Sequence, residues 1–174
     1  MRFPIGILVL LAALVFSATG MAQQQMRVPF NFQWGDSASR VEQSLVGIKA
    51  KITERKVVEG RSVIVVEGIP QKQLQRALFY FRNDMLNEIE LHFGDSSWDS
   101  PKYELFFEEV RRNVDSKYGI GRLLTRSRNR EGDVLQTLVG YQWQQPGMAL
   151  RLYLFTAEEE AKALRILSLH YKES

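Results

Sequence analysis

One serine and two histidines are the residues of this chain whose types could combine into a hydrolytic centre. Ser96 stands in a Gly94-Asp95-Ser96 block that follows a candidate strand, and His92 and His170 are the only histidines. A serine hydroxyl becomes a nucleophile when a histidine accepts its proton. The chain has no cysteine, which excludes a thiol nucleophile and a zinc–thiolate site. A hydrolase that uses Ser96 is therefore one function that the sequence allows.

The block from Phe93 to Ser96 resembles the nucleophile block of the GDSL esterases, and this resemblance implies Ser96 as the nucleophile. That family carries the block near the mature N-terminus and places its base histidine in an Asp-x-x-His motif. Here the block lies mid-chain, and Leu167 stands three residues before His170. The same Gly-Asp-Ser string at 35–37 suits a helix N-cap, because its side-chain oxygens can accept from free helical N–H groups. We therefore favour a capping turn, with the GDSL-like serine esterase as an alternative.

The two histidines could also hold a metal ion together if a pseudo-two-fold axis related the two halves of the chain. Two ligands are too few for a structural zinc site, which needs four. His92 and His170 both fall on the side of their strands that carries polar residues, and Glu90 shares the face of His92. We therefore predict solvated surface histidines, with neither a metal nor a cofactor.

Four further residues are candidates for contact with a partner, namely Trp98, Arg126, Arg128 and Arg130. The arginines could meet an acidic partner or anionic lipid headgroups. Alternatively, they belong to a solvated sheet face and to a charged edge that discourages aggregation. Trp98 stands in a loop of serine, aspartate and proline, where an exposed tryptophan would anchor an interface. We favour burial of Trp98 against the following helix over this exposed position. No catalytic residue is predicted.

Residues 1–22 have the pattern of a secretory signal peptide. Arg2 supplies a positive charge, and an unbroken apolar run from Ile5 to Phe16 follows it. Such a run is too short to span a bilayer, which takes about 18 residues or more. Small residues then allow cleavage after Gly20 or Ala22. We predict a periplasmic or secreted bacterial protein, with a retained membrane anchor as the alternative.

The composition of the mature chain indicates one ordinary globular domain. Removal of the signal peptide leaves 174 − 22 = 152 residues, which is enough to bury a core. The net charge of +3 falls to +2 when Arg2 is removed, which is too weak to indicate nucleic-acid binding. No later apolar run is long enough to cross a membrane. Because there is no cysteine, neither a disulfide nor a lipid anchor on an N-terminal cysteine is expected.

Periodicity and turn residues predict two helices and eight strands. A helix capped by Asp36 or Ser37 carries Val41, Leu45 and Ile48 at helical spacing, with Gly47 as a plausible stop, and a longer helix spans 102–118. A flexible or edge lead-in at 23–31 leads into an extended segment at 28–34. The alternating strands cover residues 49–58, 62–68, 76–82, 86–93, 122–128, 134–144, 148–156 and 164–171. Residues 130–133 are predicted as a turn, and residues 158–162 as a short helical turn or polar loop.

These elements predict an α+β fold in which two helices pack on one face of an antiparallel sheet of about eight strands. A single domain would cover residues 32–174. A helix followed by four strands occurs in 32–93 and again in 94–174. Two α-β4 halves that arose by duplication are therefore the more specific form of the prediction. The alternative is that two amphipathic strands look alike without common descent.

The opening pattern Gly35-x-Ser37-x-x-x-Val41-x-x-x-Leu45-x-Gly47 resembles two groups of small exported proteins, the SmpA/OmlA outer-membrane-assembly type and the β-lactamase inhibitor proteins. The resemblance implies binding or assembly rather than catalysis. We therefore predict an exported, non-enzymatic binding or envelope-assembly protein that contacts an unknown envelope protein. Its working surface would be the sheet face opposite the helices, together with the loop near Trp98. An inhibitor of an exported enzyme is the first alternative, and the esterase is the second.

Overall fold

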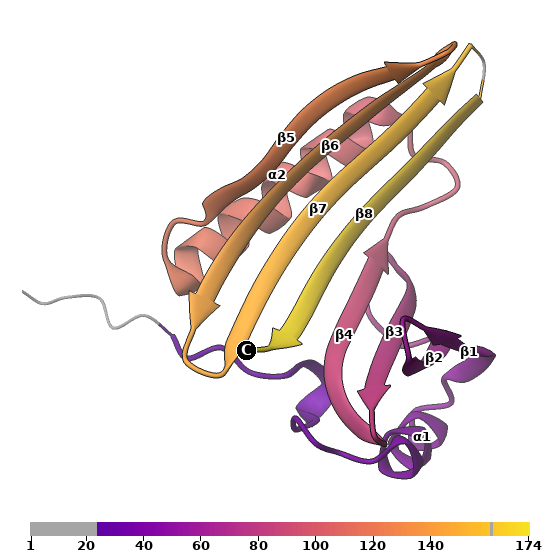
Figure 1. The fold of residues 1–174 in the computed structure, drawn as a ribbon, viewed down its shortest axis with the longest axis vertical. Coiled ribbons are helices and arrows are strands. Elements are labelled where there is room, and N and C mark those ends of the chain that lie inside the picture. Colours follow the sequence, from indigo (N-terminus) through magenta and orange to yellow (C-terminus); the bar gives the residue numbers. More distant parts are fainter. Residues whose placement is uncertain (1–23, 161) are drawn as a thin grey trace, which may run out of the picture.

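The computed structural model describes residues 24–160 and 162–174, and the predicted signal peptide lies outside them. The chain forms one antiparallel sheet of eight strands with two α-helices on one face (Figure 1), which confirms the predicted α+β class. The elements in chain order are η1 (Pro29–Asn31), α1 (Ala38–Gly47), β1 (Lys51–Val58), β2 (Arg61–Glu67), β3 (Leu74–Arg82), β4 (Met85–Phe93), α2 (Ser100–Tyr118), β5 (Arg122–Glu131), β6 (Val134–Gln145), β7 (Met148–Glu159) and β8 (Lys162–Glu173).

Each half of the chain is a helix followed by a four-stranded meander. The strand order is β1-β2-β3-β4-β8-β7-β6-β5, so the two meanders meet at their last strands, β4 and β8. The register of this junction pairs Leu91 with Leu169 and Glu90 with His170. Two α-β4 halves would give this topology, while a duplication of the sequence stays a prediction.

α1 forms where its cap and its apolar stripe predict it. The Ser37 hydroxyl oxygen accepts a hydrogen bond from the backbone N–H of Arg40 at 3.3 Å. Val41 and Leu45 lie one helical turn apart, so both face the sheet and both are buried. The helix ends at Gly47, so Ile48 leaves the apolar stripe on which its spacing predicted it and is exposed.

α2 begins at Ser100, two residues before the predicted start. Asp99 caps it by accepting from the backbone N–H of Lys102 at 3.0 Å, and Pro101 occupies the first turn, where its missing N–H is not needed. At the other end, the carboxylate of Asp115 accepts from the indole N–H of Trp143 at 3.0 Å. This hydrogen bond ties the last turn of α2 to β6.

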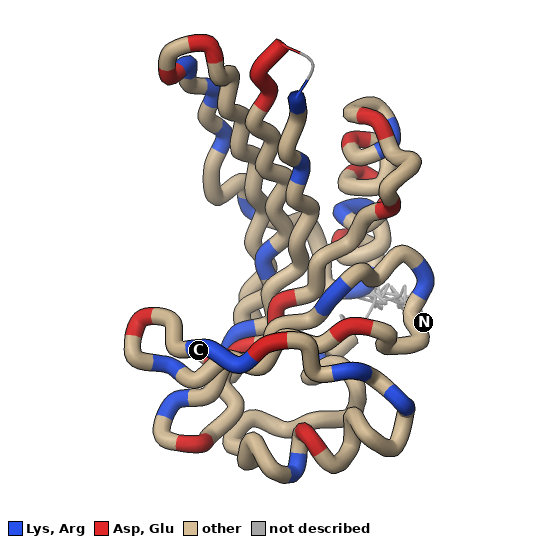
Figure 2. Tube along the Cα trace, turned by 90° about the vertical axis from the view of Figure 1, so that its right-hand side faces the viewer, with Lys and Arg blue, Asp and Glu red and all other residues tan. Residues whose placement is uncertain are grey.

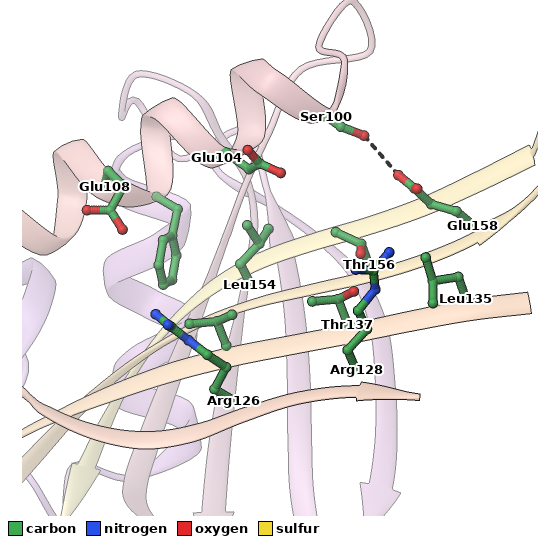
Figure 3. A pocket seen from close by; sticks show the side chains of 12 residues that line it. Ser100, Glu104, Glu108, Arg126, Arg128, Leu135, Thr137, Leu154, Thr156 and Glu158 are labelled. Atoms are coloured by element: carbon green, nitrogen blue, oxygen red, sulfur yellow. Dashed lines mark hydrogen bonds between the residues drawn. The ribbon is translucent and has the colours of Figure 1, made fainter. Parts of the chain in front are cut away.

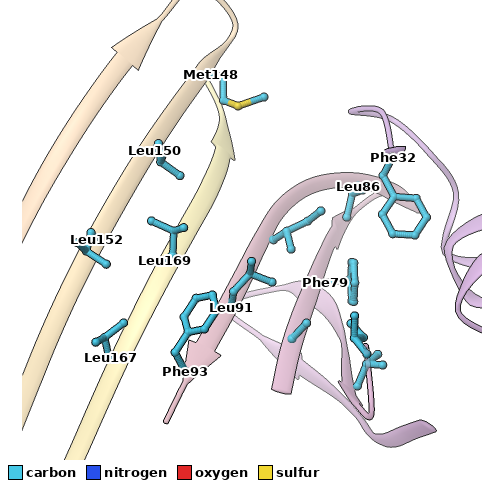
Figure 4. Close-up of a cluster of buried hydrophobic side chains, with 14 of the residues drawn as sticks. Phe32, Phe79, Leu86, Leu91, Phe93, Met148, Leu150, Leu152, Leu167 and Leu169 are labelled. Atoms are coloured by element: carbon cyan, nitrogen blue, oxygen red, sulfur yellow. The ribbon is translucent and has the colours of Figure 1, made fainter. Parts of the chain in front are cut away.

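One hydrophobic core lies between the helices and the sheet. It takes apolar side chains from β3, β4, β7 and β8 (Figure 4), and from the buried stripes of α1 and α2. Phe79, Leu150 and Leu167 have no exposed surface. Both meanders contribute side chains to this single core. The two halves are therefore held together by burial of apolar surface and also by the backbone hydrogen bonds of the β4–β8 ladder.

The extended segment predicted at 28–34 is not a strand. Pro29–Asn31 form the 3-10 turn η1, and Phe30 has a positive φ of 60°. Proline has no N–H to donate to a ladder, and its fixed φ favours a turn here. The turn places the Phe32 ring 5.6 Å from the ring of Phe79, edge to face. The lead-in is also tied to the domain, since Met26 is buried and its N–H donates to the side chain of Gln145 at 2.7 Å.

Two hairpins are longer than the sequence predicts. β7 continues to Glu159 and β8 begins at Lys162, and these two residues pair, so the loop or helical turn predicted at 158–162 is wrong. β5 likewise continues to Glu131, which places Arg130 in the strand rather than in a turn. Cross-strand pairing extends through these polar residues because the long antiparallel ladder supplies their backbone partners. Within the described residues, no helix is both long and apolar enough to cross a membrane.

Candidate interaction face

The sheet face opposite α1 and α2, here called the open face, carries the polar side of the central strands β4 and β8. On β4, Ile89, Leu91 and Phe93 point to the helices, so Glu88, Glu90 and His92 point to the open face. Across the sheet, acidic and basic residues are interspersed over both halves (Figure 2). The most concentrated group of them lies at the β4–β8 junction.

Glu88 is at the centre of this group and is buried. The Arg61 guanidinium of β2 donates to its carboxylate at 2.5 Å. From β8, the imidazole of His170 lies at 3.5 Å and the ammonium of Lys172 at 3.9 Å. Burial alone would raise the pKa of Glu88, but the hydrogen bonds from His170 and Arg61 outweigh it and lower the pKa below its usual value.

Glu90 has a comparable set of partners. The Tyr80 hydroxyl donates to its carboxylate at 2.7 Å, His92 lies in direct hydrogen-bond contact, and His170 is 3.7 Å away. Burial acts to raise the pKa of Glu90, yet the contacts with His92, His170 and Tyr80 lower it to about 2. Burial and the carboxylate of Glu90 raise the pKa of the Tyr80 phenol, so Tyr80 is held as a donor.

The predicted solvated position of the histidines is wrong for His92, which is only 9% exposed. Its Nε2 contacts Glu90, and its Nδ1 accepts from the Arg76 guanidinium of β3 at 3.2 Å. These two side chains cover part of the ring on the sheet face that the helices leave open. The alternation Glu88, Glu90, His92 placed the ring on the polar side of its strand, but its burial follows from the central position of β4, where charged residues need partners on the neighbouring strands. In the described part of the chain, no group of three or more acidic or histidine side chains is arranged to hold a metal ion.

Ser168 and His170 form a second polar contact on the open face. The Ser168 hydroxyl lies 2.9 Å from Nε2 of His170, whose Nδ1 faces Glu88. A serine hydroxyl, an imidazole and a carboxylate that contact one another in this order are the groups of a catalytic triad. Ser168 is only 4% exposed, however, and it lies on β8 between β4 and β7. Backbone N–H groups there are committed to the ladders and are not available as an oxyanion hole.

Aromatic residues border the polar cluster. The ring of Tyr153 on β7 meets the His170 ring edge to face at 5.2 Å. Gly140 on β6 makes this possible, because a Cβ at that position would come within 2.5 Å of the Tyr153 ring. On the other side, the Arg61 guanidinium stacks over the Tyr80 ring at 4.5 Å. Tyr80 in turn belongs to a small buried cluster on this face with Val63, Val65 and Leu78.

The predicted contact residues lie apart from this cluster. Trp98 is half-buried against α2, 5.3 Å from the Tyr103 ring and 5.0 Å from the Phe106 ring, as its favoured burial predicts. Arg126 and Arg128 do not lie on the open face; they line a groove on the helix side of β5 and β6 (Figure 3). Arg130 follows them on the same edge strand and is exposed.

Ser96, the nucleophile of the esterase alternative, lies exposed in the loop after β4. Asp95 beside it accepts from the backbone N–H of Ser97 at 2.9 Å and from the Ser97 hydroxyl at 2.6 Å, so the block forms a local turn. Among the hydrogen bonds of the described residues, none joins Ser96 to His92 or His170. The geometry therefore gives Ser96 no base.

Fold and surface together define an α+β protein whose eight-stranded antiparallel sheet leaves one face open and places a buried cluster of charged and aromatic side chains at the centre of that face. No family model, curated protein or solved structure matches this chain. The resemblance to the SmpA/OmlA and inhibitor groups therefore stays a prediction.

The low pKa of Glu90 predicts how stability depends on pH. Because the folded-state pKa, about 2, is below the ordinary 4.5, the contacts of the carboxylate stabilise the fold above about pH 4.5. That stabilisation, roughly 3 kcal/mol, is lost as the pH falls toward 2. In urea unfolding at a series of pH values, Glu90→Gln should be less stable than the wild type at pH 7 and should lose less stability on acidification. The control Glu54→Gln should keep the wild-type profile, and equal profiles for wild type and Glu90→Gln would contradict the assignment.

Proposed function

We propose that this chain is an exported, non-enzymatic binding or envelope-assembly protein that contacts a partner protein through the open face. The observation that carries the proposal is the buried cluster around Glu88 and Glu90. Its side chains already hold one another in place on a sheet face that the helices leave free. Burying charged groups costs free energy, and such a cost is common at binding sites.

The composition of this surface supports a protein partner. Tyrosine and arginine are enriched among residues that dominate binding energy, and Arg61, Tyr80, Tyr153 and Arg151 all stand on the open face. Their rotamers are restrained in advance; for example, Arg151 donates to the side chain of Gln142 at 2.9 Å. Restraint of this kind lowers the entropy cost of association. The interspersed charges fit a protein better than a nucleic acid, whose partners carry a dominant basic surface.

Binding rather than catalysis is also favoured by the surroundings of the two serines. Ser96 has no histidine within hydrogen-bond reach among the described residues, and Ser168 is enclosed in a fully paired part of the sheet. If purified mature protein hydrolysed a nitrophenyl ester, and if Ser96→Ala or Ser168→Ala abolished that activity, the proposal would be wrong.

Site-specific photocrosslinking in the native bacterium tests where the partner binds. A photoreactive residue at Tyr153 or Gln142 samples the open face, and one at Val46 or Leu105, exposed positions of α1 and α2, samples the helix side. We expect a discrete crosslinked species from the open-face positions only. Crosslinks of equal strength from the helices, or none from the open face, would overturn the proposal. If the captured partner is an exported enzyme whose activity falls when mature protein is added, the inhibitor alternative holds.

A further inference from the structure

β5 is the outer strand of the second meander, so one of its edges has no neighbour in the sheet. Arg126, Arg128 and Arg130 occupy alternate positions of this strand, and their cross-strand partners on β6 are Val139, Thr137 and Leu135. All three arginines therefore project to the same, helix-facing side of the edge. Thr125, Ser127 and Asn129, which alternate with them, place uncharged side chains on the other side.

These arginines differ from the basic residues at the opposite edge. On β1, Arg55 pairs with Glu42 at 3.1 Å and Lys56 with Glu54 at 3.0 Å, so each of these two cations has a carboxylate partner. Arg126, Arg128 and Arg130 are exposed, and no carboxylate of the described residues lies within ion-pair distance of them. The β5 edge therefore carries three positive charges that no ion pair within residues 24–160 and 162–174 neutralises.

A groove of ≈ 530 Å³ runs beside this edge, between α2 and the strands (Figure 3). α2 packs against β7 and β8, which leaves the β5 side of the groove open. On the far wall, Glu158 is bound to Arg165 at 3.2 Å and Glu108 to Arg111 at 2.7 Å. Glu104 is the remaining acidic side chain of the lining, so the arginine side of the groove is the side that attracts negative charge.

We propose that the β5 edge binds an extended, acidic segment of a partner protein as an additional strand. The unpaired N–H and C=O groups of an edge strand can hydrogen-bond to such a segment, and acidic residues at every second position would lie beside Arg126, Arg128 and Arg130. A second copy of the chain is the wrong occupant, because pairing β5 with β5 would bring arginines beside arginines. This surface is separate from the open face, so the inference does not rest on the proposed function.

A synthetic peptide with glutamate at alternate positions and threonine or valine between them is the probe. Fluorescence anisotropy should show that it binds mature wild-type protein, and hydrogen exchange should show new protection of the β5 amides. Arg126→Glu/Arg128→Glu should weaken binding roughly tenfold or more, because each cross-strand charge pair contributes about 0.2–1 kcal/mol and reversal makes it repulsive. The matched control Arg55→Glu/Lys56→Glu, at the other edge, should bind as the wild type does.

Backbone-modified peptides separate strand addition from simple charge attraction. N-methylation at the alternate residues whose N–H groups face β5 should abolish binding, whereas N-methylation of the other alternate set should be tolerated. The proposal would be overturned if the two modified peptides bound equally well. It would also be overturned if a peptide with its glutamates in one block bound as well as the probe, or if the probe did not bind wild-type protein. If the double arginine variant does not fold, the modified peptides still decide the question with the wild-type protein.

Discussion

Replacement of Phe79 by alanine is expected to lower the free energy of unfolding by about 3–5 kcal/mol, because it removes a large ring from a fully enclosed position. Phe79 has no exposed surface and contacts the rings of Phe32 and Phe30, at centroid distances of 5.6 and 6.3 Å. Its loss would leave a cavity where β3, the lead-in and the core meet. Urea unfolding followed by circular dichroism measures the change.

Leu105→Ala is the matched control for this experiment. Leu105 is 58% exposed on α2, so its truncation should change the free energy of unfolding by less than about 0.5 kcal/mol. A loss below about 1 kcal/mol for Phe79→Ala would contradict the packing of the lead-in on β3 that the structure shows.

Replacement of Arg61 by methionine is expected to destabilise the fold by about 3 kcal/mol or more, because it leaves the buried charge of Glu88 with weaker partners. Arg61 is the nearest cation to Glu88, at 2.5 Å, and both side chains are nearly enclosed. Replacing both residues removes the uncompensated charge, so Arg61→Met/Glu88→Met should lose less stability than the sum of the two single variants. Chemical denaturation of the four proteins of this cycle gives the coupling directly.

Arg55→Met gives the comparison for an exposed pair. The side chain of Arg55 is 62% exposed and its contact with Glu42 is open to solvent, so the loss should stay at or below about 1 kcal/mol. If Arg61→Met proved no more damaging than Arg55→Met, the cluster at the β4–β8 junction would not be the rigid platform that we infer.

Local sequence signals were sufficient to predict both α-helices and all eight strands, but not the turn η1. Ser37 and the spacing of Val41 and Leu45 predicted α1, and alternation predicted all eight strands. The burial of His92 depends instead on which strands become neighbours. Glu90 contacts His170 only because β4 and β8, distant in the chain, pair at the centre of the sheet. No local pattern encodes that pairing.

The face of the β5 arginines was missed for a different reason. In an unbroken strand, Arg122 and Arg126 would point to the same side. The ladder shifts its register between Leu123 and Thr125, so Arg122 pairs with Gln142 while Arg126 pairs with Val139 of the core side. One extra residue in the strand reverses the direction of every later side chain. A bulge of this kind has no dependable signature in a single sequence.

The β4–β8 ladder is shorter than β8, so the first residues of β8 have no hydrogen-bonding strand on that side. β8 begins at Lys162, but its pairing with β4 starts only at Leu167. Besides β1 and β5, the sheet therefore has a third unpaired margin, along the first residues of β8, with Leu164 partly exposed on it. Lys162 is exposed at the start of this margin, and a lysine in such a place opposes edge-to-edge pairing with a strand of another chain.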